Sequence, residues 1–236
     1  MAEIIEVFMS AGVDAVYGVN PDAQDLMDAI KDAEHRSGRK CIRISIPGIN
    51  TQGGPDAIAE TERILDAHAA CGTHILMPHQ DSTDALVDRR TRSIPNMDRY
   101  LAMIRERGMI PGLSTHMPET IPYADESGLD VATYIQIYNA AGFLMQVEVD
   151  WVHRIIWEAK KPVIAIKPLA AGRLLPLVGL AFVWATLREQ DMVTVGTLSS
   201  DEAHEVIEYS RALLERRKPN LDLQHTRSKA SLDTPQ

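Results

Sequence analysis

Apolar positions along the chain recur at two alternating spacings. Near the start they follow helical intervals over residues 4–9 and stop at Gly12, after which residues 13–19 form an extended apolar run. This helix-then-strand order repeats to the end of the chain. It predicts helices at 22–35, 56–70, 96–107, 119–126, 151–159, 178–188 and 201–215, and strands at 41–46, 73–79, 109–116, 131–138, 162–169 and 192–198.

This alternation predicts the fold class. Strands separated by helices pair in parallel through right-handed crossovers, and strands that are apolar throughout are covered on both faces. We therefore expect an α/β fold of the TIM-type (β/α) barrel. About seven strands are recognisable, and a helix stands where a standard barrel has its first strand. The barrel is therefore expected to be incomplete, unless a piece of chain is missing or one strand has too weak a pattern.

Length and composition predict one domain. The chain has 236 residues, of which 45% are hydrophobic, enough for one substantial core. We assign the barrel to residues 1–217 and a polar tail to residues 218–236, which is either disordered or packed on a neighbouring subunit. A barrel that lacks one strand leaves an edge that needs cover, so we expect a homo-oligomer.

The net charge and the cysteine content limit which binding partners and which cellular compartment we expect. The net charge of −9 disfavours nucleic acids and anionic membranes, which attract basic surfaces. Cys41 and Cys71 are too few for a disulfide framework or a thiolate metal site. The first residues lack the pattern of a signal peptide, and no apolar run reaches membrane-spanning length. We expect a cytoplasmic protein that acts on a small molecule.

Two histidines end neighbouring predicted strands. His79 follows the apolar run from Thr73, and His116 follows the run from Met109. Side chains alternate along a strand, so an inward His79 implies an inward Met77, and an inward His116 implies an inward Ser114. The carboxyl ends of the strands form the face where such barrels do their chemistry. We expect both imidazoles there, although a histidine at a strand end also serves as a hydrogen-bonded structural residue.

Acidic residues follow each histidine. Asp81 and Asp84 come after His79, and Glu119 comes after His116. His79, His116, Asp81 and Glu119 would suit a divalent zinc, manganese or iron ion with an open coordination position. The alternative is that the acids are turn and helix-capping residues.

Further polar residues end the next two strands. Lys167 follows an apolar run, and a lysine at the barrel mouth would act as a base, a Schiff-base amine or an anion clamp, unless it pairs with a loop acid. Gln136 and Tyr138 share one face of the preceding strand, and Asn139 follows it. We expect these three to orient a polar ligand.

The last predicted helix opens with Ser199, Ser200, Asp201 and Glu202. A serine three residues before a glutamate has the spacing of a capping box. The alternative is phosphate binding at the helix N-terminus, which Arg173 would assist and the two acids would oppose.

Several segments together resemble the aldo-keto reductase superfamily over most of residues 3–215. Residues 2–14 look like the first helix and turn of that family. Residues 164–174, which contain the sequence Pro-Leu-x-x-Gly, look like its penultimate strand and cofactor loop. Residues 193–202 look like its last strand and phosphate-binding turn. The resemblance implies a barrel that binds NADP. The cofactor residues it implies are Ser114, Gln136, Arg173, Ser199 and Ser200.

The family's catalytic tetrad of Tyr, Lys, Asp and His is matched only by His79. The strand that should end in the lysine, residues 41–46, lacks one, and Asp14 and Tyr17 are the nearest candidates for the acid and the tyrosine. Ile166 replaces the family's stacking tyrosine. The resemblance therefore implies a related barrel with a rebuilt active site.

Three functions follow from these observations. The first is a non-redox isomerase, lyase or hydrolase for a small polar carbonyl or sugar-like substrate, with His79 and His116 as metal ligands or an acid–base pair and with Lys167 and Tyr17 as further catalytic candidates. The second is an NADP-dependent aldo-keto reductase. The third is a non-catalytic barrel that binds a ligand or serves in assembly.

Overall fold

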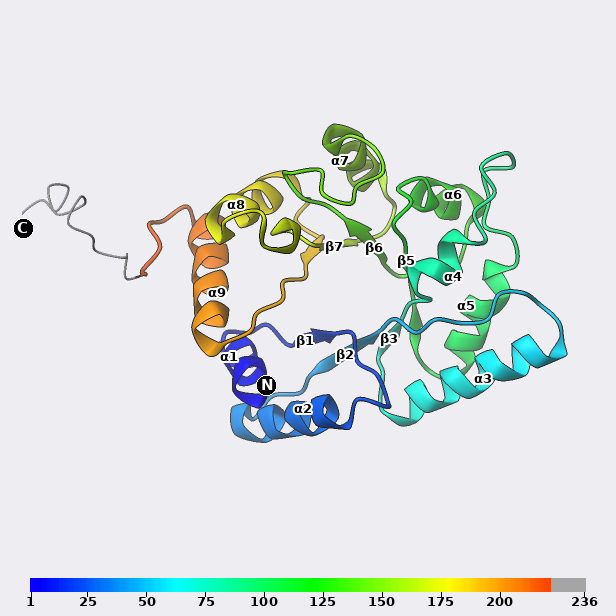
Figure 1. The fold of residues 1–236 in the computed structure, drawn as a ribbon, viewed down its shortest axis with the longest axis horizontal. Helices are drawn as coiled ribbons and strands as arrows, with labels where there is room; N and C mark the ends of the chain where they lie inside the picture. The colour runs from blue at the N-terminus through cyan, green and yellow to red at the C-terminus, as the bar shows by residue number, and fades with distance from the viewer. Residues whose placement is uncertain (222–236) are drawn as a thin grey trace, which may run out of the picture.

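The structure is a computed structural model that describes residues 1–221. Helices form the outside of a ring and short strands lie inside it (Figure 1). Of the tail predicted at 218–236, residues from 222 onward lie outside the described part. The arrangement is the predicted α/β barrel type, with helix and strand alternating along the chain.

The observed elements fall close to the predicted ranges. The helices are α1 (Ala2–Ser10), α2 (Gln24–Ser37), α3 (Pro55–Ala70), α4 (Gln80–Asp84), α5 (Met97–Glu106), α6 (Thr120–Ser127), α7 (Val149–Glu158), α8 (Pro176–Thr186) and α9 (Ser200–Glu215), with a 3₁₀ turn η1 (Ala170–Gly172). The strands are β1 (Ala15–Tyr17), β2 (Ile42–Ser45), β3 (Ile75–Leu76), β4 (Ile110–Pro111), β5 (Leu113–Ser114), β6 (Tyr134–Ile137), β7 (Val163–Ile166) and β8 (Met192–Val193).

The eight strands occupy seven positions in the barrel. They form two parallel four-stranded sheets, β1-β2-β3-β4 and β5-β6-β7-β8, and β4 and β5 belong to one extended run that divides at Gly112. The Gly112 N–H still donates to Leu76 on β3, whereas the next N–H, from Leu113, donates to Thr133 before β6. One run therefore joins both sheets, in agreement with the predicted seven strands.

The barrel is open on one side. Within residues 1–221 no ladder joins β8 to β1, as expected for an incomplete barrel. Helices α1 and α9 pack against each other beside this opening, and the Arg211 guanidinium on α9 donates to the Ala11 carbonyl after α1 (Figure 1). Helix packing takes the place of the missing strand pairing.

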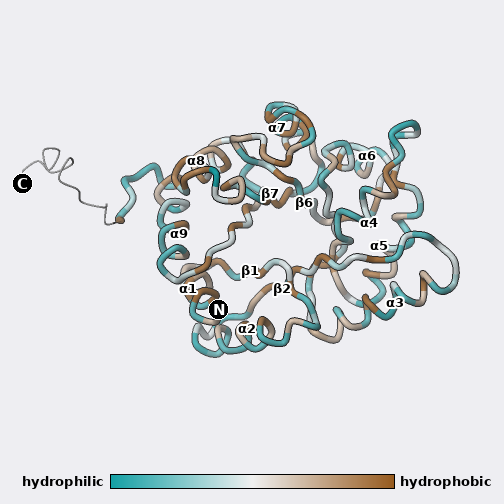
Figure 2. The backbone as a smooth tube through the Cα atoms, in the orientation of Figure 1, coloured by the Kyte–Doolittle hydropathy of each residue, from teal (hydrophilic) through white to brown (hydrophobic). Residues whose placement is uncertain are grey.

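Two apolar layers separate the inside of the barrel from the helices. The inner layer includes Ile44, Met77, Ile135 and Ile164, and the outer layer packs strand residues against α5, α7, α8 and α9. Alternate residues of β6 and β7 enter different layers, as strand geometry requires. Figure 2 shows the hydrophobic colour along β7 and a mainly hydrophilic α9.

One short helix was not predicted. Asp81 and Asp84, expected in a loop, lie in the five-residue α4. Among the described residues, no helix is long and apolar enough to cross a membrane.

Candidate functional site

His79 begins α4 at the carboxyl end of β3. Its backbone N–H donates to the Pro47 carbonyl and extends the pairing with β2. Its Nδ1 lies 3.4 Å from the Asp81 backbone nitrogen, which donates to it, and 3.2 Å from the Asp81 carboxylate. The imidazole thus caps a helix while about a third of its side chain stays exposed.

Asp84 ends the same short helix and contacts the next strand. Its carboxylate accepts the Thr115 hydroxyl and, at 3.1 Å, the backbone N–H of His116. Burial raises the pKa of Asp84, and these two hydrogen bonds oppose that shift. Helix α4 therefore connects the two histidines, because one end carries His79 and the other holds the backbone of His116.

His116 lies among charged groups from three strand ends. Burial lowers the pKa of His116, and the positive charges of Lys167 and His79 lower it further, while Asp81 raises it. The strands are parallel, so the carboxyl ends of β3, β5 and β7, which are followed by His79, His116 and Lys167, lie at one mouth of the barrel. Asp81 follows His79 there, in α4.

Lys167 starts a segment with an uncommon backbone. Lys167, Ala170 and Ala171 have positive φ angles of 58°, 50° and 54°. Such angles are unfavourable for residues with a Cβ and are kept where the surrounding structure enforces them, often at functional sites. The strained segment redirects the chain at the barrel mouth.

The proposed metal ligands come together only in part. The Glu119 carboxylate accepts from the Arg89 guanidinium, and Glu119 does not contribute to the pKa shift of His116. Within residues 1–221 no group of three or more His, Cys, Asp or Glu side chains has metal-binding geometry. The donor set His79, His116, Asp81 and Glu119 therefore does not fit a metal in this conformation.

Gln136 and Tyr138 lie on the helix side of β6. Their neighbours Ile135 and Ile137 fill the inner layer, whereas Tyr138 packs at 5.0 Å between ring centroids on Phe182 of α8. The Tyr138 hydroxyl lies 3.0 Å from the Thr186 hydroxyl, and the Gln136 Nε2 donates to the Ile137 carbonyl. These two residues share a face, as predicted, but that face is turned away from the barrel interior.

Asn139 and Arg173 hold loops at the mouth. The Asn139 side chain donates to the Phe143 carbonyl and accepts the Phe143 N–H, which closes the loop after β6. The Arg173 guanidinium lies 4.0 Å from the Phe143 ring centroid and donates to the Ala170 carbonyl. Both side chains were predicted to contact a ligand. Instead, Asn139 bonds within the loop after β6, and Arg173 connects that loop to the segment after β7.

Ser114 and Tyr17 face the interior of the barrel. Ser114 is buried on β5 and pairs in register with Ile135 of the inner layer. Tyr17 packs against the same layer from β1, and burial raises the pKa of Tyr17 to about 12. Asp14, the other tetrad candidate, precedes β1 and pairs with Arg39, so it lies at the opposite end of the barrel.

Ser199 caps α9, as the spacing predicts. Its hydroxyl accepts the Glu202 N–H at 3.1 Å, and the Glu202 carboxylate accepts the Leu198 N–H at 2.7 Å. Ser200 is the first residue of that helix, followed by two acids in the first turn. Of the residues that the family resemblance implies for NADP, Ser114 faces the interior, while Gln136 faces the helices and Ser199 is used as a cap.

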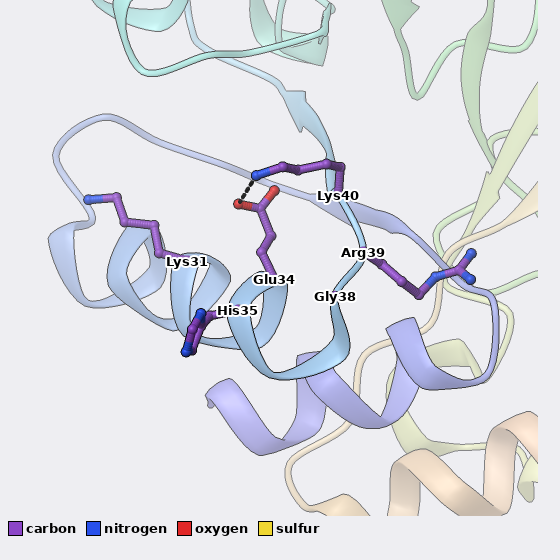
Figure 3. A pocket seen from close by; sticks show the side chains of 6 residues that line it. All are labelled: Lys31, Glu34, His35, Gly38, Arg39 and Lys40. Carbon is purple, nitrogen blue, oxygen red and sulfur yellow. Dashed lines mark ion pairs between the residues drawn. The ribbon is translucent and has the colours of Figure 1, made fainter.

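One surface hollow lies away from this site. It has a volume of about 390 Å³ and lies at the C-terminal end of α2, with Lys31, Glu34, His35, Gly38, Arg39 and Lys40 around it (Figure 3). That position is beside the amino ends of the strands, where barrel residues usually serve stability rather than catalysis. Glu34 bonds to Lys40, so part of the charge there is already paired.

Sequence patterns left two contributions to the site unforeseen. Asp84 was named as an acid after His79, but its hydrogen bonds to Thr115 and to the backbone of His116 were not predicted. Met145, in the loop after β6, packs against the inner layer from the mouth side, and no sequence signal pointed to it.

Comparisons with known proteins show the fold. No family model and no curated protein matches the sequence. Among solved structures, a Pseudomonas aeruginosa protein provisionally named an aldo-keto reductase aligns with a TM-score of 0.65 and 15% identity, covering 90% of this chain and 80% of that one. An aldose reductase from Schistosoma japonicum aligns with a TM-score of 0.56 and 13% identity, covering 98% of this chain and 88% of that one. A thiamine phosphate pyrophosphorylase from Pyrococcus furiosus aligns with a TM-score of 0.53 and 10% identity, covering 91% of this chain and 89% of that one. At such low identity these likenesses establish a TIM-barrel type fold and nothing about activity.

Proposed function

We propose that this protein is an enzyme that moves a proton next to the carbonyl group of a small polar or sugar-like substrate, without redox chemistry. The observation that supports it is that His79, His116 and Lys167 follow β3, β5 and β7 at the carboxyl end of the barrel, where Lys167 and His79 lower the pKa of His116. Titratable groups with a shifted pKa at that end of such a fold are typical of active sites.

The two histidines differ in a way that suits acid–base chemistry. The pKa of His116 is lowered, so the neutral imidazole, which accepts a proton, predominates at neutral pH. The Nδ1 of His79 accepts the Asp81 N–H, so Nε2 is the ring nitrogen that can donate a proton. We assign His116 as the base that takes the substrate proton and His79 as the acid that donates to the carbonyl oxygen.

Lys167 would stabilise the charge that this step creates. Removing a proton next to a carbonyl leaves an enolate, whose oxygen is negative until His79 protonates it. A positive ammonium group at the mouth lowers the energy of that charge. Asp84 would act as a positioning residue, because it holds the backbone at His116.

Deuterium exchange tests the proposal without knowledge of the natural substrate. Dihydroxyacetone, glyceraldehyde and pyruvate are incubated in D₂O with the protein, and loss of the α-proton signal is followed by NMR. We expect the intact chain to accelerate exchange of at least one probe, and His116→Gln to reduce that rate by about 100-fold or more. His35→Gln, at an exposed position on α2, is the matched control and should leave the rate unchanged. Equal rates in His116→Gln and the intact chain would refute the assignment.

Two alternatives remain proposals of lower rank. An NADP-dependent reductase is favoured by the fold likeness and by the inward Ser114, and opposed by the outward Gln136. Saturable enhancement of NADPH fluorescence would support it. A metal enzyme would need Glu119 to leave Arg89, and stoichiometric zinc, manganese or iron in protein purified without chelator would support that rearrangement.

A further inference from the structure

Helix α8 has an unusual composition for an outer helix of a barrel. Its sequence, Pro-Leu-Val-Gly-Leu-Ala-Phe-Val-Trp-Ala-Thr, contains no charged residue and is apolar on all sides. An outer helix normally has one polar face, and a helix that is apolar all round is typical of a buried position. In Figure 2 α8 contrasts with the mainly hydrophilic α9 beside it.

One face of α8 is fixed against the barrel. Leu180 and Val183 are buried in the outer layer, and a Cβ at Gly179 would lie 2.7 Å from the Pro168 carbonyl oxygen. The helix cannot rotate to hide its other face without losing this packing. Its solvent side therefore stays apolar, with Leu177 exposed by 44% and Val178 by 49%.

The exposed face is complementary to a second copy of itself. Leu177 and Ala185 are both exposed and each lies four positions from the partly buried Ala181, on the same side of the helix. If two copies of α8 cross in antiparallel fashion at Ala181, the large Leu177 of each copy meets the small Ala185 of the other. This is the mutual arrangement that a two-fold axis requires.

Charge also favours a second copy over a charged partner. The chain has a net charge of −9, so its own copies repel one another over most of the surface. The α8 face is free of charge, and two copies can meet there without like charges in contact. An acidic or basic partner would find no complementary group on this helix.

We propose that α8 forms the centre of a homodimer interface, with Ala181 on the two-fold axis and Leu177 packed against Ala185 of the second copy. This inference does not depend on the proposed catalytic function. It assigns a surface and a register to the association, and both can be tested directly.

Cysteine cross-linking tests the register. In a Cys41→Ser, Cys71→Ser background, Ala181→Cys should form a disulfide-linked dimer under mild oxidation, because the two positions meet on the axis. Leu177→Cys alone should not, because two copies of residue 177 lie about 12 Å apart along the helices, beyond the reach of a disulfide. An equimolar mixture of the Leu177→Cys and Ala185→Cys chains should again cross-link. Absence of the Ala181→Cys product, or equal linking by Leu177→Cys alone, would overturn the proposal.

Light scattering with size-exclusion chromatography tests the surface. The full chain should have the mass of a dimer at 50 to 100 µM, and Leu177→Glu with Val178→Glu should be monomeric with an unchanged circular dichroism spectrum. Val13→Glu, which changes another exposed apolar residue far from α8, should stay dimeric. A monomeric full chain would overturn the proposal, as would a dimer unaffected by the α8 charges. If the chain dimerised only after deletion of residues 222–236, that segment would be the occupant of α8 and the proposal would fail.

Discussion

At the scale of single residues, the candidate site is held together by one short helix. His79 caps the start of α4, and Asp84 at its end binds the backbone of His116. The separation of the two imidazoles is thus set by backbone contacts rather than by a direct bond between the rings. A substitution of Asp84 should therefore change the position of His116, whereas a substitution of Lys167 should change the pKa of its imidazole.

The pKa of His116 should depend on Lys167. NMR titration of the His116 ring should give a midpoint below the ordinary value of about 6.5, because burial and the Lys167 charge both disfavour the imidazolium ion. Lys167→Met should raise that midpoint, whereas Lys161→Met, at an exposed position, should not. The unfolded chain binds the proton more readily, so this group reduces stability only as pH falls below about 6.5. A midpoint unmoved by Lys167→Met would contradict the placement of the lysine.

Asp84→Ala should destabilise the fold by about 2 kcal/mol in urea unfolding. The substitution leaves the Thr115 hydroxyl and the His116 N–H without their charged acceptor. A hydrogen bond to a charged group contributes about 1.5–3 kcal/mol to the free energy of unfolding. Glu62→Ala, at an exposed carboxylate on α3, should cost less than about 0.5 kcal/mol. Asp84→Asn, which keeps an acceptor oxygen, should fall between them. A cost for Asp84→Ala no larger than that of the control would show that α4 does not hold His116.

Strand parity could be predicted for some site residues and not for others. Alternation correctly predicted that Met77 and Ser114 face the interior. Each lies two residues before a histidine, His79 or His116, that was expected to point inward. Alternation could not show which side of β6 is inside, because β6 is buried on both faces, and Gln136 lies on the helix side. The side-chain partners of Asn139 and Arg173 depend on loop shape, which sequence periodicity does not describe.

At the scale of elements, Gly112 determines how the two sheets join. A Cβ there would lie 2.7 Å from both Met77 Cγ and the Thr133 carbonyl oxygen. Gly112→Ala should therefore lower the free energy of unfolding by about 1–3 kcal/mol through overpacking. Gly48→Ala is the matched control, because its Cβ would meet no atom within 4 Å, and it should stay within about 0.5 kcal/mol of the parent. Comparable urea midpoints for the two variants would mean that the junction can open to admit a methyl group.

Most elements followed from the sequence because each has a pattern longer than one helical turn. The amphipathic spacing of α2, α3 and α9 and the apolar runs of β6 and β7 were found within a few residues. The pattern failed for α4, because five residues are too few to display a helical period. The division of one predicted strand into β4 and β5 was also missed, since it depends on a change of neighbour rather than on composition.

At the scale of the whole molecule, the barrel has two edge strands. β1 and β8 each pair with one neighbour, whereas β6 and β7 pair on both sides, within the part of the chain that the structure describes. The sequence predicted the missing strand position, because a helix begins the chain where a strand is expected. It could not predict that α1 and α9 pack together beside the opening, since this contact joins the two ends of the barrel.

The open side should be visible in native-state hydrogen exchange. Amides of β1 and β8 should exchange faster than those of β6 and β7 after correction for intrinsic rates, because an edge strand opens by breaking one ladder and a central strand must break two. Mass spectrometry of peptides covering residues 13–19, 131–138, 162–169 and 190–196 would measure the difference. Burial favours the same order, because Ala15 on β1 and Met192 on β8 are exposed, whereas β6 and β7 are buried throughout. Equal protection of β1, β6 and β8 would contradict the open barrel, because edge strands that open as rarely as central ones must have gained a hydrogen-bonding neighbour in solution.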